Sequence, residues 1–266
     1  MRIGVLGCAG RMGRSNLREV LASDGVHLAG GVERPGHPAV GEDLGVLAGG
    51  DAIGLRAGDD ATSLIRAADA VIEFSTPEAT LAHARLCAAI GCAHIIGTTG
   101  LDPAQAAELA SLAMQIPIVQ AANMSLGVNL LLDLVRQVAA TLDAAYDIEI
   151  VEMHHRHKVD APSGTALALG AAAAAGRGLA PEAGFVRARD GLTGPRPPGS
   201  IGFAVLRGGD VVGDHTVCFA GDGERLELTH RATDRRIYAR GAVRAARWTK
   251  GRPPGLYGMA DVLGQR

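Results

Sequence analysis

The first half of the chain alternates short apolar runs with segments of helical character, and this pattern limits the fold more than any other feature. The expected strands are Ile3–Leu6, His27–Val32, Ala70–Phe74, His94–Ile96 and Ile118–Gln120, and the expected helices are Met12–Ser23, Pro77–Ile90 and Pro103–Met114. Two of these helices open with a capping residue and a proline, Thr76-Pro77 and Asp102-Pro103, as helix starts commonly do. Strands that alternate with helices predict a parallel sheet covered on both faces.

The second half has a different pattern, which predicts a second domain of α+β type. A helix near 129–142 leads to a strand at Asp147–Met153, and Ser163 is placed to cap an alanine-rich helix. Further strands are expected at Ile201–Arg207, Val211–Phe219 and Arg225–His230, with hairpin turns at Gly208–Asp210 and Gly221–Gly223 and a last helix near 233–248. We therefore divide the chain into residues 1–125, 126–233 and a C-terminal segment, 234–266.

Composition and charge exclude several classes of protein. The 266 residues are 47% hydrophobic and 20% charged, which is an ordinary globular balance. A net charge of −2 gives no general reason to expect a nucleic-acid partner. No stretch approaches the roughly 20 apolar residues that span a bilayer, and the N-terminus lacks a signal-peptide pattern, so we expect a cytoplasmic protein without membrane contact. The spacing of the four cysteines suits neither a metal site nor a disulfide framework.

The glycine-rich run Gly7–Gly13 (GCAGRMG) follows the first strand and opens a helix. Glycines there let the backbone approach a pyrophosphate, whose charge the amides of the helix start can meet. Glu33 follows the second strand, about 20 residues past the last glycine, where a ribose-binding acid is expected. Arg34 beside it suits the 2′-phosphate of NADP, although an ordinary exposed arginine remains an equal alternative. The pattern predicts a Rossmann-like doubly wound domain that binds NADH or NADPH.

Two further strand ends should border the same crevice, because ligands of open α/β sheets bind beyond the carboxyl ends of the strands. Gly97–Gly100 (GTTG) follows one strand and Ala121–Ser125 (AANMS) follows another. Both are also compatible with plain connecting turns, but their small residues suit close approach to a nicotinamide ring.

The segment Glu152–Thr165 (EMHHRHKVDAPSGT) concentrates the chemistry of the second half. A zinc site on His154, His155 and His157 is disfavoured, since adjacent histidines lack ordinary ligand spacing. A solvated charged loop remains an alternative. We favour an acid/base and carboxylate-binding site, because histidine titrates near neutrality, lysine supplies a proton or a charge, and the helix opening at Ser163 can receive a carboxylate. No metal is expected.

Five segments together resemble the 4-hydroxy-tetrahydrodipicolinate reductase family over nearly the whole chain. They are GCAGRMG, AANMSLGVN, EMHHRHKVDAPSGTA, GFAVLRGGDVVGDHTVCFAG and GERLELTHRA. The resemblance implies a dinucleotide-binding domain, a substrate-binding and oligomerisation domain, a C-terminal return to the first domain, and a homotetramer. The implied reaction is NAD(P)H-dependent reduction of 4-hydroxy-2,3,4,5-tetrahydrodipicolinate, a dicarboxylate of diaminopimelate and lysine biosynthesis, to tetrahydrodipicolinate with loss of water.

The resemblance also implies roles for individual residues. His154 is the implied proton donor and acceptor, and Lys158 the proton donor. The substrate's carboxylates are met by His155, Gly164 and Thr165. The implied nucleotide-binding residues are Gly7, Cys8, Ala9, Gly10, Arg11, Met12, Glu33, Arg34, Gly97, Thr98, Thr99, Ala121, Ala122, Asn123 and Met124.

Two other functions stay open on the sequence. A non-catalytic dinucleotide sensor would retain the fold without the chemistry, and the intact pair of His154 and Lys158 disfavours it. Another dehydrogenase on the same scaffold, acting on a sugar for example, would not need the cationic segment that suits a dicarboxylate.

Overall fold

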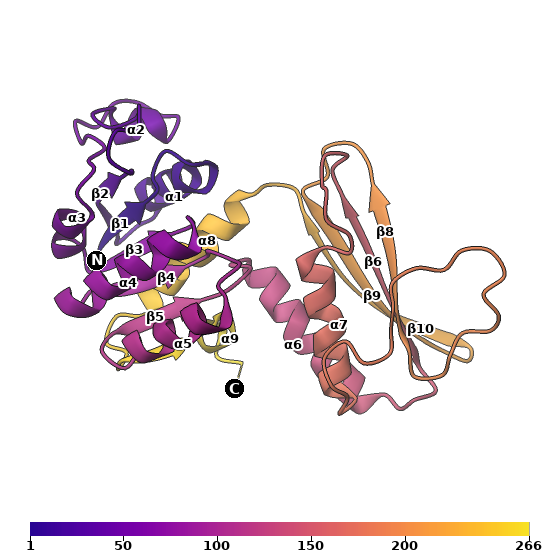
Figure 1. Ribbon diagram of the computed structural model, residues 1–266. Coiled ribbons are helices and arrows are strands. Elements are labelled where there is room, and N and C mark those ends of the chain that lie inside the picture. The colour runs from indigo at the N-terminus through magenta and orange to yellow at the C-terminus, as the bar shows by residue number, and fades with distance from the viewer. Residues whose placement is uncertain (266) are drawn as a thin grey trace. The chain divides into compact units, whose positions relative to one another are not determined.

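The computed structural model describes residues 1–265, which form two compact units (Figure 1). Unit 1 contains Met1–Leu126 together with the chain from Arg236 onward, and unit 2 contains Gly127–Arg235. Each unit has its own sheet and its own apolar core. The predicted fold class, a doubly wound parallel domain with a second α+β domain, is confirmed.

Unit 1 is built on a six-stranded, entirely parallel sheet of strand order β11-β5-β4-β3-β1-β2. The strands are β1 (Arg2–Leu6), β2 (His27–Val32), β3 (Ala70–Glu73), β4 (Ala93–Ile96), β5 (Pro117–Gln120) and β11 (Gly255–Tyr257). The helices are α1 (Arg11–Ala22), α2 (Leu44–Leu47), α3 (Ala61–Ala67), α4 (Pro77–Ile90), α5 (Pro103–Leu112), α8 (Arg236–Trp248) and α9 (Met259–Leu263). The strand order reverses between β1 and β3, which places the switch point of the sheet beside the loop that follows β1.

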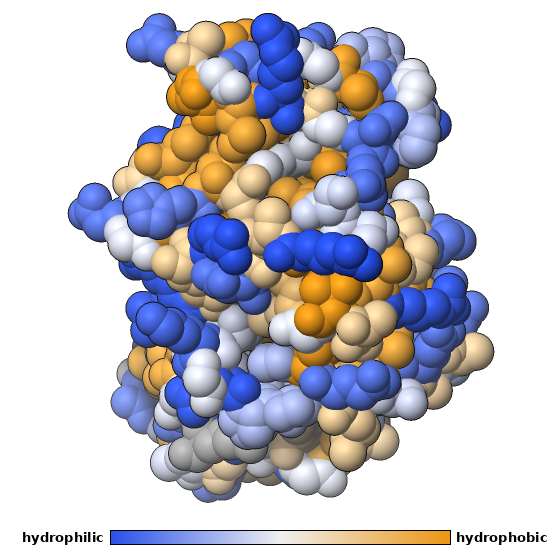
Figure 2. Space-filling view, turned by 90° about the vertical axis from the view of Figure 1, so that its left-hand side faces the viewer, coloured by the Kyte–Doolittle hydropathy of each residue, from blue (hydrophilic) through white to orange (hydrophobic). Residues whose placement is uncertain are grey.

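Helices cover both faces of this sheet, as a parallel sheet requires. One apolar cluster joins the strands to α1, α8 and α9, and another joins them to α3, α4 and α5. On the face of the molecule that Figure 2 shows, hydrophilic side chains separate the hydrophobic ones into patches. No helix among residues 1–265 is long and apolar enough to cross a membrane.

The strand register aligns the ends of five strands in one row. Leu6 lies opposite both Val32 and Glu73, Glu73 lies opposite Ile96, and Ile96 lies opposite Gln120. The residue after each strand end therefore begins a loop at the same edge of the sheet. These first loop residues are Gly7, Glu33, Phe74, Gly97 and Ala121.

Unit 2 packs two helices on one face of a five-stranded mixed sheet of order β10-β9-β6-β8-β7 (Figure 1). The strands are β6 (Asp147–His154), β7 (Phe185–Val186), β8 (Ile201–Arg207), β9 (Gly213–Gly221) and β10 (Glu224–Ala232), and the helices are α6 (Leu126–Thr141) and α7 (Gly164–Gly176). Alternate residues of β6, Ile148 and Ile150, enter the core beneath these helices.

One predicted hairpin is wrong and the other is confirmed. β9 and β10 are antiparallel neighbours joined at Gly221–Gly223, as expected. The turn at Gly208–Asp210 joins β8 to β9, but these strands are not neighbours because β6 lies between them, parallel to β8 and antiparallel to β9. The connection instead crosses the end of β6, where the Gly208 amide donates to the His154 carbonyl (3.0 Å) and the His155 amide to the Val211 carbonyl (2.8 Å).

Candidate active site

Glycines shape the loop after β1. Gly7 has a φ of +68°, a region in which side chains are strained. A Cβ at Gly13 would lie 2.0 Å from the Gly7 carbonyl oxygen, so α1 packs directly against the loop. Gly10 is the N-cap of α1, and no side chain caps the helix there. This uncapped helix start beneath a glycine loop fits the pyrophosphate of a dinucleotide.

Glu33 braces the same loop from the end of β2. Its Oε1 accepts a hydrogen bond from the Ala9 amide (2.8 Å), and its Oε2 lies 3.4 Å from the Arg34 amide. The side chain is half-buried, whereas Arg34 and Arg11 are exposed. The structure therefore brings the predicted ribose acid to the glycine loop, and it leaves Arg11 of that loop and Arg34, the residue after Glu33, in reach of solvent.

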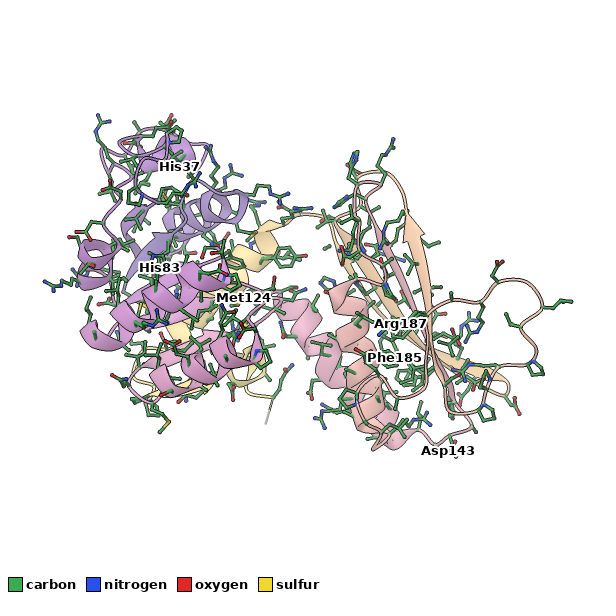
Figure 3. The ribbon with its side chains drawn as sticks, in the orientation of Figure 1. His37, His83, Met124, Asp143, Phe185 and Arg187 are labelled. Carbon is green, nitrogen blue, oxygen red and sulfur yellow. The ribbon has the colours of Figure 1, made fainter. Side chains whose placement is uncertain are left out.

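Three residues assigned to the nucleotide site turn their side chains into the protein. Cys8 is fully buried beside Leu17 and Leu44, and its burial raises the pKa of the thiol to about 12. Met124, labelled in Figure 3, lies in the core cluster with α8, where it is 1% exposed. Thr98 is 4% exposed, and its hydroxyl accepts hydrogen bonds inside unit 1. These three residues can meet a nucleotide only through their backbone groups.

The remaining residues of the two later loops stay nearer the surface. Thr99 and Ala122 are exposed, and Gly97 and Ala121 are half-buried. Asn123 folds back on its own loop, since its Oδ1 accepts from the Ser125 amide (2.8 Å).

In unit 2, His154 is the last residue of β6 and is anchored by a buried carboxylate. Its Nδ1 lies 2.5 Å from Oε2 of Glu152, which is two residues earlier on the same face of the strand. Because a carboxylate only accepts, Nδ1 carries the proton, and Nε2 is left to exchange one. Gly213 provides room there, since a Cβ at that position would lie 3.0 Å from Nε2.

Glu152 stays ionised because donors surround it. Arg207 forms a two-pronged pair with it (2.8 and 3.0 Å), and the Ser163 amide donates to Oε1 (3.0 Å). Burial by itself would raise the pKa of Glu152, but the hydrogen bonds from Arg207, His154 and Ser163 outweigh it and hold the pKa below its usual value. The strand register explains the pairing, because β8 places Arg207 directly opposite His154.

His215 on β9 gives His154 a second buried neighbour. The two rings meet edge to face with their centroids 5.1 Å apart. The Ser163 hydroxyl, which also accepts from the Ala166 amide, lies 3.0 Å from Nε2 of His215 and can donate to it. Burial, followed by the charge of His154, lowers the pKa of His215 to about 4, so His215 is neutral at physiological pH.

Lys158 lies in the loop between β6 and α7, where Asp160 holds it. Its Nζ donates to both carboxylate oxygens of Asp160 (2.8 and 2.9 Å), and this contact lowers the pKa of Asp160. The lysine side chain is 19% exposed. Arg207 also binds the Asp160 carbonyl oxygen (2.7 Å), so the same guanidinium orders the strand end and the lysine loop.

Two of the predicted carboxylate-binding residues, Gly164 and Thr165, sit at the start of α7, and the third, His155, directly follows β6. Ser163 is the N-cap, as predicted, and Gly164 and Thr165 form the first turn. A Cβ at Gly164 would meet no atom within 4 Å, so the helix start is open there. His155 is half-buried, and its Nε2 lies 3.4 Å from Nη2 of Arg235.

The sequence reading missed the residues that support His154 and Lys158. Glu152, Asp160 and Ser163 stand in the motif itself, but nothing in their spacing showed which side chain they serve. Arg207 and His215 come from other strands, and only the pairing of β6 with β8 and β9 brings them together. Among residues 1–265, no group of three or more histidine, cysteine, aspartate or glutamate side chains is placed to hold a metal ion.

Comparison with known proteins gives concordant results for sequence and fold. Residues 1–124 match the family described as dihydrodipicolinate reductase, N-terminus, and residues 127–263 match dihydrodipicolinate reductase, C-terminus. A 4-hydroxy-tetrahydrodipicolinate reductase from Parvibaculum lavamentivorans is 58% identical over 265 residues, covering 99% of this chain and 98% of the relative. One from Dinoroseobacter shibae is 55% identical over 262 residues, covering 98% and 97%. In fold, the chain is similar to dipicolinate-bound dihydrodipicolinate reductase from Paenisporosarcina sp. TG-14, with a TM-score of 0.78 at 23% identity over 98% of both chains.

Proposed function

This chain belongs to the dihydrodipicolinate reductase family and catalyses the reduction of 4-hydroxy-tetrahydrodipicolinate in lysine biosynthesis, and we propose that it does so with NADH or NADPH in unit 1 and with His154 and Lys158 as the acid/base groups of unit 2. Two features of this chain support the proposal. They are the glycine loop at the switch point of the parallel sheet and the anchored histidine at the end of β6.

The glycine loop and the start of α1 suit the pyrophosphate of the cofactor, and Glu33 suits a ribose hydroxyl. When bound, NADH or NADPH supplies the hydride of the reduction. Arg34 is exposed directly after Glu33, so it can pair with a 2′-phosphate without disturbing the bond between Glu33 and Ala9. The chain therefore has Glu33 for the ribose of NADH and Arg34 for the 2′-phosphate of NADPH, and we propose that it uses both cofactors.

The helix start at Gly164 and Thr165 suits a substrate carboxylate. Backbone amides and the positive end of the helix dipole favour a negative charge at this position. His155, whose Nε2 lies 3.4 Å from Nη2 of Arg235, suits the second carboxylate. Two carboxylates held at fixed places would orient the ring that is reduced.

Proton transfer falls to Lys158 and His154 in this proposal. The reduction consumes one hydride and one proton and releases water. Hydride addition to one ring carbon leaves negative charge on the neighbouring carbon, and Lys158 supplies the proton there. Asp160 holds the ammonium group of Lys158 in place until the substrate arrives. Glu152 keeps Nδ1 of His154 protonated, so that Nε2 takes up or releases a proton beside the substrate.

The observation that carries the proposal is the arrangement of Glu152, His154 and Lys158, in which a buried carboxylate fixes one acid/base group and Arg207 joins that carboxylate to the loop that holds the lysine. The test measures NADH and NADPH oxidation with the pathway intermediate for the wild type, His154→Ala and Lys158→Ala. We expect kcat to fall by about 10²–10⁴-fold in either variant, the usual contribution of general acid–base catalysis.

His157→Ala is the matched control, because His157 is an exposed histidine of the same segment. It should retain kcat within about threefold, since an exposed side chain without a buried partner has little to contribute. Equal losses of kcat in His157→Ala and His154→Ala would show that the segment contributes only general positive charge, and would overturn the assigned roles.

We also propose a homotetramer that uses the sheet of unit 2. The face of this sheet turned away from α6 and α7 exposes Val151 and Leu206, whose exposed fractions are 36% and 50%. Exposed apolar side chains on a sheet face that also carries charged pairs suit a subunit contact. Light scattering that gives the mass of one chain at micromolar concentration would contradict the proposal.

A further inference from the structure

Glu73 is a fully buried carboxylate at the end of β3, and no role has been assigned to it so far. It is 0% exposed, and two histidines reach it from different elements. Nδ1 of His83 on α4 lies 2.8 Å from Oε1, and Nε2 of His94 on β4 lies 2.8 Å from Oε2. The Ser75 hydroxyl donates to Oε1 as well. Figure 3 labels His83 on its helix.

These donors keep Glu73 charged inside the protein. Burial alone would raise its pKa, but the hydrogen bonds from His83 and His94 outweigh it and lower the pKa to about 2. A buried carboxylate is costly unless it is paired, so a chain that needed only packing here would be served better by an apolar residue. The group therefore calls for a role that packing does not supply.

A second set of hydrogen bonds joins this carboxylate to the loop after β4. The Thr98 hydroxyl oxygen accepts from the Ser75 amide (3.0 Å) and from the Thr80 hydroxyl (2.8 Å). Thr80 is 0% exposed on α4, one turn before His83. Ser75 is thus held at both ends, through its hydroxyl by Glu73 and through its amide by Thr98.

The loop of Thr98 is one of those assigned to the nucleotide. Gly97 has no side chain with which to anchor it, and the ring of Phe74 occupies the space that a Cβ there would need, 2.1 Å away. Thr99 is exposed. Thr98 is therefore the one side chain of Gly97–Thr99 that is turned inward, and its hydrogen bonds fix the loop together with the bond from the Gly97 amide to the Glu73 carbonyl oxygen (2.8 Å).

We propose that Glu73 and Thr80 are positioning residues for the nucleotide, which hold the Gly97–Thr99 loop through Ser75 and Thr98 in the conformation that meets the cofactor. This inference rests on the proposed assignment of NADH or NADPH to unit 1. Neither residue touches the cofactor. Each acts by keeping the loop in its binding-competent conformation, and a loop that is competent for a smaller fraction of the time binds proportionally more weakly.

The sharpest test is Thr80→Val, which removes the hydroxyl and keeps the shape of the side chain. Losing one hydrogen bond of roughly 1 kcal/mol lowers the competent fraction by up to about fivefold. The dissociation constant of NADH, measured by fluorescence titration, should rise two- to fivefold. The effect should appear in NADH affinity, with kcat at saturating NADH and the KM of the dicarboxylate substrate within about twofold of the wild type.

Two further variants separate positioning from a general loss of stability. Thr249→Val is the matched control, because Thr249 is also a buried threonine of unit 1, and it bonds the Ala246 carbonyl (2.7 Å) at the end of α8. It should lower the melting temperature without changing NADH affinity. Thr98→Val should weaken NADH binding at least as much as Thr80→Val, and the double variant should be no weaker than Thr98→Val alone, because Thr80 acts through Thr98.

The outcomes distinguish this inference from the function on which it rests. A wild-type chain that binds neither NADH nor NADPH would overturn the proposed cofactor and the inference with it. A wild-type chain that binds NADH, with Thr80→Val binding equally tightly, would overturn the inference alone. Additive effects in the double variant, or an equal loss of affinity in Thr249→Val, would also refute it. Glu73→Gln should exceed Thr80→Val in its effect on the dissociation constant, and a Glu73→Gln protein with wild-type affinity would remove Glu73 from the proposal.

Discussion

Replacing Glu152 by glutamine should separate the positioning of His154 from the stability of unit 2. The carboxylate uses both oxygens, because Arg207 Nη1 binds Oε2 and Arg207 Nη2 binds Oε1. Glutamine offers one oxygen and one NH₂ group, so an N–H must face an N–H on one side of the pair. It also leaves Nδ1 of His154 without a fixed anionic acceptor, so the ring can adopt the other tautomer.

The structure sets the size of the expected loss of stability and of the expected loss of turnover. Glu152 is 1% exposed and the Arg207 side chain 21% exposed, so the change breaks a largely buried pair. Breaking such a pair costs about 3–5 kcal/mol, and the partial exposure of Arg207 favours the lower value, about 3 kcal/mol of unfolding free energy. Loss of an oriented acid/base group should lower kcat by about 10²–10⁴-fold, with a much smaller change in the KM of the substrate.

The assay combines NADH oxidation with urea unfolding and uses Glu149→Gln as its control. Glu149 lies on the same strand but on the opposite face, where it pairs with Arg189 and Arg196. Its partly exposed pairs should contribute at most about 1 kcal/mol, and its loss should leave kcat unchanged. Arg207→Lys keeps a cation beside Glu152 and provides a milder test if Glu152→Gln folds poorly. A folded Glu152→Gln enzyme with wild-type kcat would refute the reasoning, as would an equal loss of kcat in Glu149→Gln.

Three further changes have expected outcomes. Lys158→Arg should be nearly as impaired in kcat as Lys158→Ala, because arginine keeps the charge but does not readily release a proton, and near wild-type turnover would show that charge alone is needed. Arg34→Ala should weaken the binding of NADPH more than that of NADH, by roughly 1–3 kcal/mol. Unchanged Michaelis constants for both cofactors would show that Arg34 is not part of the site. His215 has a pKa of about 4 in the folded protein and 6.5 in the unfolded chain, so below pH 6.5 the unfolded chain is protonated first. The free energy of unfolding of unit 2 should therefore fall by up to about 3 kcal/mol as the pH falls from 6.5 to 4. His215→Asn should flatten that part of the curve of melting temperature against pH, and an unchanged curve would contradict the assignment.

Local patterns were enough to predict the framework of unit 1 and the ends of several helices. The helix starts at Thr76, Asp102 and Ser163 are confirmed, because each side chain accepts an amide hydrogen bond only a few residues ahead. The parallel sheet followed from the alternation of strand and helix, and its carboxyl edge followed from that topology. Periodicity could not predict four elements because they are too short: the helices α2 and α3 and the edge strands β7 and β11.

Long-range pairing decided what the sequence left open. A Gly-Gly-Asp turn is compatible with a hairpin, but the insertion of β6 between β8 and β9 depends on strands far apart in the chain, and the same insertion delivers Arg207 and His215 to His154. Which way Cys8, Thr98 and Met124 point also depended on neighbours from other elements. Turns and caps are set by contacts within a few residues, and these can be read along the chain. The support of a catalytic side chain is set by burial and by donors from distant strands, and these exist only once the sheet has formed.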